Sequence, residues 1–151
     1  MFEDAFFYGT FTAAQVARSL AGMYGARWNA DSFSAYLRRF GLDAGKKLKE
    51  YSRGMRMKLN LASALAHRPE LLVLDEPVTG LDPAAAQDLY RTLDYLNKKE
   101  GLAIIMVTHD LHSALPYATA ILHAGHGSWF YGDTAAYLAS PYGKRFGGDG
   151  I

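Results

Sequence analysis

Two short, continuously apolar runs dominate the hydrophobic pattern of this chain, at Leu71–Leu74 and at Ala103–Val107. A run of this length without polar interruptions is typical of a strand buried on both faces, as in a parallel sheet. Between the two runs, residues 83–99 carry leucines at helical spacing, with Asp82 as the expected N-cap and Gly101 as the stop. The order strand, helix, strand predicts an α/β fold with a mainly parallel sheet.

Before the first run, apolar residues recur at intervals of three and four, which predicts amphipathic helices. Thr12 and Gln15 have the capping-box arrangement at the start of the first helix. The expected ranges are 12–24, from 29 or 31 to 40, and 52–68. The first two helices should form a small helical layer, and the lysine-rich segment 43–50 between the second and third should be solvated.

After the second run, the pattern predicts a helix over 111–117, two strands over 120–123 and 129–131 around a glycine turn, and a short helix over 134–139. The glycine-rich end, 141–151, is expected to be a loose tail. The chain is therefore divided into a helical part over 1–50, an α/β core part over 51–140 and the tail.

The amino-acid composition excludes several classes of function. The 151 residues are 50% hydrophobic and 21% charged, with a formal net charge of +1, which gives no general attraction to nucleic acid or anionic membranes. The absence of cysteine excludes disulfide scaffolds, thiolate metal sites and thiol catalysis. No run approaches the roughly 20 apolar residues of a membrane helix, and the start, Met1-Phe2-Glu3-Asp4, has no signal-peptide pattern.

The first apolar run ends in two adjacent carboxylates, Asp75 and Glu76. Side chains in this place lie at the carboxyl end of a strand, where open α/β sheets bind ligands, and paired acids there are costly without a cation. They indicate a metal and phosphate site, although a solvated acidic turn would show the same residues. The second run ends at Thr108-His109-Asp110, so His109 should approach Asp75 and Glu76 at the same sheet edge.

A second candidate site is the turn Tyr51-Ser52-Arg53-Gly54-Met55 before the third helix. Free N–H groups at a helix start, together with a serine hydroxyl, can bind an anion. Gly54 would allow a phosphate to approach the backbone closely, because it has no side chain to block the approach.

Together these motifs resemble the carboxyl-terminal part of an ABC transporter ATP-binding domain, a P-loop NTPase fold. Leu71–Glu76 is similar to Walker B with its following glutamate, Gly80-Leu81-Asp82 to the D-loop, Thr108–Asp110 to the switch-histidine loop, and Ser52–Met55 to the signature. The Tyr-Ser-basic-Gly-Met form of the signature resembles the branch paired with ABC-2 type exporters. The resemblance covers Glu3 to about Asp133, and the order and spacing of the four motifs carry it.

The resemblance implies roles for the acidic and histidine residues. Asp75 would hold Mg²⁺, Glu76 would polarise the attacking water, and His109 would contact the γ-phosphate of ATP. Glu3 falls where the family has its Q-loop glutamine, which links the metal to the transmembrane partner; a glutamate keeps an oxygen ligand but adds charge.

It also implies roles for residues that face a second ATP-binding domain. Ser52 and the Gly54 amide would bind the γ-phosphate of ATP held by the opposite subunit, and Asp82 would lie at that dimer interface. Two positions depart from the common signature, because Arg53 replaces a glycine and Met55 a glutamine. Arg53 would either add positive charge near the phosphate or point to solvent, and solvent is slightly favoured.

One motif of the family is missing from this sequence. A Walker A loop needs Gly-x-x-x-x-Gly-Lys-Ser/Thr after a strand. The nearest stretches, 41–47 and 143–145, fail in spacing and in the final residue. We therefore expect the chain to be a truncated P-loop NTPase (ABC ATPase) with a small helical subdomain.

The implied function is the ATP-binding and hydrolysing part of an ABC transporter subunit that drives export. Its partners would be a transmembrane permease and a second ATP-binding domain, in a homodimer or a heterodimer, with no nucleic acid. It would lie at the cytoplasmic face of the cell membrane. The main alternative is a non-catalytic fragment that acts only as an interaction module, and a soluble ATPase of the same superfamily is a weaker third.

Smaller alternatives stay open. Two histidine pairs have the three-residue spacing of some zinc sites but lack an obvious third ligand. The aromatic residues Phe6, Phe7 and Tyr8 would form either a contact surface for a membrane subunit or part of the core. A lysine cluster could bind nucleic acid, but a solvated loop is favoured. The histidine pairs are His109/His112 and His123/His126, and the lysines are Lys46, Lys47 and Lys49.

Overall fold

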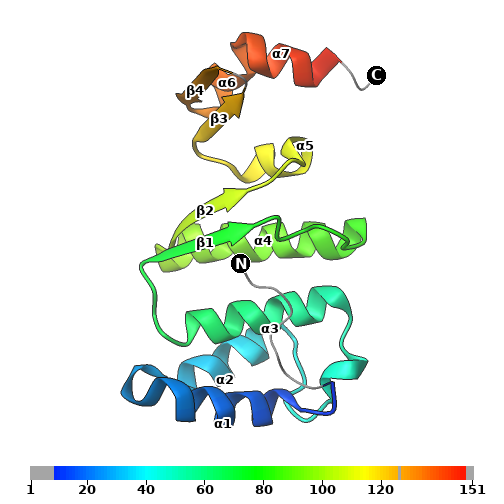
Figure 1. Ribbon diagram of the computed structural model, residues 1–151, viewed down its shortest axis with the longest axis vertical. Coiled ribbons are helices and arrows are strands. Elements are labelled where there is room, and N and C mark those ends of the chain that lie inside the picture. The colour runs from blue at the N-terminus through cyan, green and yellow to red at the C-terminus, as the bar shows by residue number, and fades with distance from the viewer. Residues whose placement is uncertain (1–8, 126, 149–151) are drawn as a thin grey trace. The chain divides into compact units, whose positions relative to one another are not determined.

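The computed structural model describes residues 9–125 and 127–148, and the chain divides into two compact units after His109 (Figure 1). The first unit contains α1 (Ala13–Tyr24), α2 (Ala30–Arg39), α3 (Arg53–Leu65), β1 (Leu71–Asp75), α4 (Pro83–Glu100) and β2 (Ala103–Val107), with short 3₁₀ turns at Gly25–Arg27 and Leu48–Glu50.

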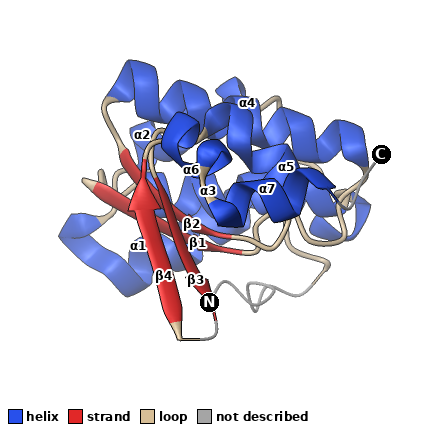
Figure 2. Cartoon of the chain, turned by 90° about the horizontal axis from the view of Figure 1, so that it is seen from above, coloured by secondary structure: helices blue, strands red, loops and turns tan. Residues whose placement is uncertain are grey.

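Strands β1 and β2 form a parallel pair, with register from Leu71↔Ala103 to Asp75↔Val107 (Figure 2). Helix α4 joins them, as the sequence predicts. It starts at the N-cap Asp82 and ends at Gly101, whose left-handed φ of 71° suits a glycine C-cap. The core of this part includes Tyr90 of α4 together with leucines from α4 and from the even-numbered positions of β1: Leu72, Leu74, Leu89, Leu93 and Leu96.

The prediction that both strands are buried on both faces is wrong. Leu72 and Leu74 are 4% and 1% exposed, but Val73 and Ile105 are 55% and 53% exposed, and Leu71 and Val107 are similarly open. Strand side chains alternate between faces. Helix α4 covers one face, and among the described residues of the first unit nothing covers the other. An aliphatic surface therefore remains open on this sheet.

The helical layer consists of α1, α2 and α3, which pack together in the first unit (Figure 1). Thr12 and Gln15 form the predicted capping box, and Asn29 caps α2 by accepting from the Ser32 N–H at 2.8 Å. Because α3 packs against α1 and α2, the layer extends past residue 50, the end of the helical part expected from sequence.

The segment 43–50 is not simply solvated. Leu48 is 7% exposed, and its N–H donates to the carbonyl of Phe11 at 2.8 Å. Lys47 forms an isolated bridge with Thr12. The buried Leu48 side chain and these backbone contacts together hold the loop against the helical layer.

The second unit contains α5 (Leu111–Ala114), a 3₁₀ turn at Leu115–Tyr117, the antiparallel hairpin β3 (Ile121–Gly125) and β4 (Ser128–Gly132), α6 (Thr134–Ala139) and α7 (Pro141–Gly148). The predicted hairpin and the helix over 134–139 are confirmed. The predicted helix over 111–117 changes to a 3₁₀ turn at Leu115–Tyr117, which carries a proline in its first turn.

The expected loose tail is also corrected, because residues 141–148 form α7. Ser140 precedes Pro141, and its hydroxyl accepts from the Gly143 N–H at 3.2 Å, so the pair Ser-Pro starts a helix. Within residues 9–125 and 127–148, no helix has both the length and the apolar content needed to cross a membrane.

Candidate functional site

The site is organised around the ends of the two parallel strands. Glu76 directly follows β1, and its N–H donates to the carbonyl of Val107 at the end of β2, at 2.9 Å. One Glu76 carboxylate oxygen, Oε1, accepts from the His109 N–H at 2.9 Å and lies 2.7 Å from His109 Nδ1. The predicted approach of His109 to Glu76 at one sheet edge is therefore confirmed.

These hydrogen bonds favour the ionised form of Glu76 and orient the ring of His109. The bond from the His109 side chain, with smaller help from its backbone N–H and from Thr79, holds the pKa of Glu76 below its ordinary 4.5. Glu76 is thus a carboxylate at neutral pH, and a carboxylate only accepts. Nδ1 of His109 must then carry the proton and donate it toward Glu76, which sets the orientation of the imidazole ring.

The backbone at Glu76 is strained. Its φ is +46°, in the left-handed region that residues other than glycine rarely adopt. Such a conformation costs of order 1–3 kcal/mol and persists only when surrounding contacts hold it. Here the holding contacts are the hydrogen bonds to Val107 and His109, and strain of this kind is concentrated at functional sites.

Asp75, the last residue of β1, is exposed at the strand tip. Among residues 9–125 and 127–148, no group of three or more histidine, cysteine or acidic residues could hold a metal. A single exposed carboxylate suits Mg²⁺, which binds through one or two carboxylates and takes its other ligands from water and phosphates. Asp75 therefore fits the predicted metal role, whereas Glu3 and the aromatic residues Phe6, Phe7 and Tyr8 lie outside the described residues.

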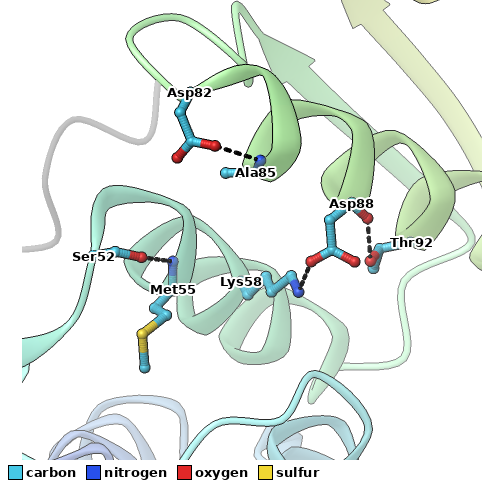
Figure 3. A network of polar contacts seen from close by, with 7 residues as sticks. All are labelled: Ser52, Met55, Lys58, Asp82, Ala85, Asp88 and Thr92. Carbon is cyan, nitrogen blue, oxygen red and sulfur yellow. Dashed lines mark hydrogen bonds and ion pairs between the residues drawn. The ribbon is translucent and has the colours of Figure 1, made fainter.

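The signature-like turn forms the N-terminus of α3. The Ser52 hydroxyl accepts from the Met55 N–H at 3.2 Å and is the N-cap, with Arg53 and Gly54 in the first helical turn (Figure 3). A Cβ added at Gly54 would lie 3.2 Å from Cβ of Ala85 in α4. Gly54 therefore allows α3 and α4 to approach closely, a packing role that the sequence argument about phosphate access did not include.

The N-terminus of α4 lies beside that of α3. Asp82 caps α4 by accepting from the Ala85 N–H at 2.9 Å, as predicted (Figure 3). Farther along, Lys58 of α3 forms an ion pair with Asp88 of α4. The two helix starts that carry Ser52 and Asp82 are consequently held together within one unit.

A cavity of about 120 Å³ lies between α3 and the end of β1. Its walls combine two arginines of α3 with the two carboxylates at the strand end, and its lining also includes Asn60 and Thr79. Sequence reasoning missed Asn60, although its seven-residue spacing from Arg53 places both on one helix face. The charged residues of the lining are Arg53, Arg56, Asp75 and Glu76.

Arg53 is exposed, as the sequence analysis favours, but its side chain does not simply extend into solvent. Its guanidinium lies against Gly80, in the turn between β1 and α4. A Cβ on Gly80 would lie 2.8 Å from Cζ of Arg53 and would overlap the guanidinium. Nothing in the sequence pattern indicated this contact.

Comparison with known proteins supports one family. A family model described as "AAA domain, putative AbiEii toxin, Type IV TA system" matches residues 27–114, more than half of the chain. The chain is 37% identical over 109 residues to the uncharacterized ABC transporter ATP-binding protein YdbJ of Bacillus subtilis, covering 71% of this chain and 35% of that protein. It is 40% identical over 91 residues to the energy-coupling factor transporter ATP-binding protein EcfA2 of Bacillus cereus, covering 60% and 31%.

The chain thus spans about a third of the length of the curated relatives it matches. Among solved structures, it resembles the ATP-binding cassette MJ0796 in a dimeric post-hydrolysis state bound to ADP and Pi, with a TM-score of 0.67 and 22% identity. The match covers 88% of this chain and 61% of that one, and it shows that the α/β fold is that of an ABC ATPase. The chain therefore belongs to the AAA-domain family matched over residues 27–114, and its relatives place it among the ATP-binding domains of ABC transporters.

Proposed function

We propose that this chain is the carboxyl-terminal part of the ATP-hydrolysing subunit of an ABC transporter, which couples hydrolysis to export through a membrane partner. The observation that carries the proposal is the Glu76–His109 pair, an ionised carboxylate and a histidine of fixed orientation at the ends of adjacent parallel strands. The family membership and the neighbouring Asp75 support it.

In this proposal Glu76 orients and polarises the water that attacks the γ-phosphorus of ATP. The bond between that phosphorus and the ADP oxygen breaks, and the water's oxygen and both of its protons leave as part of H₂PO₄⁻. Phosphoryl transfer needs mainly positioning and charge stabilisation, so one oriented carboxylate suffices. His109, held through Nδ1 by Glu76, would present its ring to the γ-phosphate, and Mg²⁺ held by Asp75 would neutralise phosphate charge.

Ser52, Arg53, Gly54 and Met55 form the half of the site that would serve the partner subunit's nucleotide. The first-turn N–H groups of an α-helix and its positive dipole end favour a phosphate there. Asp82 would lie at the same interface, because its helix start is beside that of α3. The second subunit is either another copy of this protein or a related ATP-binding domain.

The open aliphatic face of β1 and β2 supports a further part of this proposal. Side chains such as Val73 and Ile105 are more than half exposed, which is unfavourable for aliphatic groups. We propose that a preceding segment of the full protein, carrying the Walker A loop, covers this face. The share of the relatives that the chain spans agrees with a longer protein.

The proposed location is the cytoplasmic face of the cell membrane, through a permease subunit. Export, rather than import, rests on the Tyr51–Met55 form of the signature, which resembles that of ABC-2 type exporters. No nucleic-acid partner is proposed, because the net charge is only +1.

The test uses the full protein of which these residues are a part. Glu76→Gln should abolish ATP turnover and preserve ATP binding, and it should trap an ATP-bound dimer visible by size-exclusion chromatography with light scattering. Glu70→Gln, a change of the same kind at an exposed position before β1, is the matched control and should hydrolyse ATP normally. Normal turnover by the Glu76 variant would remove the assigned role of this residue.

One observation favours the alternative of an interaction module. The hairpin of the second unit also exposes large apolar side chains, with Leu122, Trp129 and Tyr131 all more than two-thirds exposed. A protein that only uses such surfaces for binding would bind no ATP even at full length. The binding measurement on the Glu76→Gln protein therefore separates the two functions.

A further inference from the structure

The contact between Arg53 and Gly80 joins two segments that the proposed mechanism uses separately. Arg53 is the first residue of α3, directly after Ser52. Gly80 has a φ of +71° and precedes Asp82 by two residues, in the turn that begins at Glu76. The guanidinium therefore connects the signature-like turn to the loop that leads from the proposed catalytic glutamate to α4.

The guanidinium occupies the space that a side chain at residue 80 would need, so a Cβ there would displace the end of the flexible Arg53 side chain. A Cβ there would lie 2.8 Å from Arg53 Cζ and 3.4 Å from Nε, so the planar guanidinium rests directly on the backbone of Gly80. Real Cβ atoms essentially never lie this close to another heavy atom, so in a Gly80→Ala variant the Arg53 guanidinium would have to move away from the loop. Two further contacts lie between α3 and α4, one of Gly54 with Ala85 and one of Lys58 with Asp88.

The charge of Arg53 is not taken up by an acidic neighbour in the part of the chain that the structure describes, since no carboxylate there lies within ion-pair distance of it. Its side chain also lines the cavity that contains Asp75 and Glu76. Shape and backbone contact, rather than an ion pair, are thus what this residue supplies in the fold.

We propose that Arg53 is a positioning residue that sets the placement of the Gly80–Asp82 loop relative to Ser52. The inference rests on the proposed function, in which Ser52 and Asp82 together meet the partner subunit's nucleotide site. By resting on Gly80, Arg53 fixes the position of Asp82 relative to Ser52 within one subunit. The same contact links that arrangement to the turn that carries Glu76.

If the relative placement of Ser52 and Asp82 is lost, ATP turnover should become slower, while the first binding of ATP should not weaken. In the proposed function, ATP would bind first to the nucleotide-holding part of its own subunit, and Arg53 would act only when the two subunits close. In the full protein, Arg53→Ala should lower kcat about tenfold, within the up to roughly 100-fold that a 1 Å misplacement can cost, and change KM for ATP by less than about twofold.

Two variants separate positioning from charge and from backbone strain. Arg53→Lys keeps the charge but lacks the planar fork, so it should be as slow as Arg53→Ala; restored turnover would show that Arg53 acts by charge near the phosphate and would overturn the proposal. Gly80→Ala should also lower kcat, whereas Gly101→Ala should not. Gly101 is the matched control, because its φ is also +71° and nothing lies within 4 Å of an added Cβ.

The double variant Arg53→Ala/Gly80→Ala gives the decisive comparison. If Arg53 acts through Gly80, the double variant should be no slower than the slower single variant; independent, multiplying losses would refute the contact as the cause. If the wild-type protein hydrolyses ATP and Arg53→Ala has the same kcat, this inference is overturned and the proposed function still stands. A full-length wild type that binds ATP but never hydrolyses it overturns the proposed function, and this inference with it.

Discussion

The left-handed backbone at Glu76 leads to a prediction in which stability and activity separate. Glu76→Ala and Glu76→Gly both remove the carboxylate and its hydrogen bonds to His109, so neither should hydrolyse ATP. Both keep the backbone hydrogen bond from residue 76 to Val107, which still holds the φ of +46°, so they differ in whether a Cβ is present at this φ. Glycine populates this region freely, but alanine does not.

The expected difference follows from two opposing terms. A residue with a Cβ in the left-handed region costs roughly 1–2 kcal/mol, and glycine loses roughly 0.5–1 kcal/mol more chain entropy on folding than alanine. The glycine variant should therefore be more stable than the alanine variant by about 0.5–1 kcal/mol. For a domain of about 150–250 residues, this corresponds to a Tm difference of roughly 1–4 °C.

The assay is thermal and urea unfolding of the two variants in the full protein, followed by circular dichroism. Gly101→Ala provides the calibration, because Gly101 has a φ of +71° with open space around it and its replacement should lose stability by a similar amount. Equal stability of the two Glu76 variants, with Gly101→Ala clearly destabilised, would refute the strained conformation at residue 76.

Three further predictions test the site and its surroundings. The isolated 151-residue chain should show no micromolar ATP binding in calorimetry, because it lacks a Walker A motif; micromolar binding would contradict this. The depressed pKa of Glu76 contributes stability that is fully present above its ordinary 4.5 and is lost as pH falls through the lower folded value. His109→Ala should therefore make the free energy of unfolding less dependent on pH below 4.5. An unchanged pH slope would contradict the pairing of Glu76 with His109. Val73→Lys should be nearly neutral in this chain, where Val73 is 55% exposed, but should destabilise the full protein by at least about 2 kcal/mol if a preceding segment buries it. Leu122→Lys serves as the exposed control. Equal effects of Val73→Lys on the stability of both proteins would argue against a preceding segment that covers β1.

The sequence was informative where local chemistry decides the structure. The apolar runs and the leucine spacing between them were enough to predict β1, α4 and β2 and to bring His109 to Glu76. The caps Thr12 and Asp82 could be predicted, and Asn29 was one of two candidates with Asp31, because a side-chain oxygen at a helix start satisfies nearby N–H groups.

Features that depend on contacts between distant segments could not be predicted from the sequence. The resting place of Arg53 on Gly80 is a tertiary contact, and the φ of Glu76 is imposed by hydrogen bonds across two strands. The start of α7 at Ser140-Pro141 has a local sequence signal, but the glycine-rich composition of this segment led to the expectation of a loose tail.

The mistaken burial of β1 is the most informative difference, because it connects the open face to the chemistry. Alternation along the strand places Asp75 on the same face as Leu71 and Val73, and that face is exposed from one end of the strand to the other. A segment that covers these aliphatic residues along the whole strand would therefore also lie beside the Asp75 carboxylate. In the proposed function, burial of this face and completion of the phosphate site are consequently one structural event, in which a single preceding segment supplies both the missing hydrophobic contacts and the groups that hold the nucleotide opposite Asp75 and Glu76.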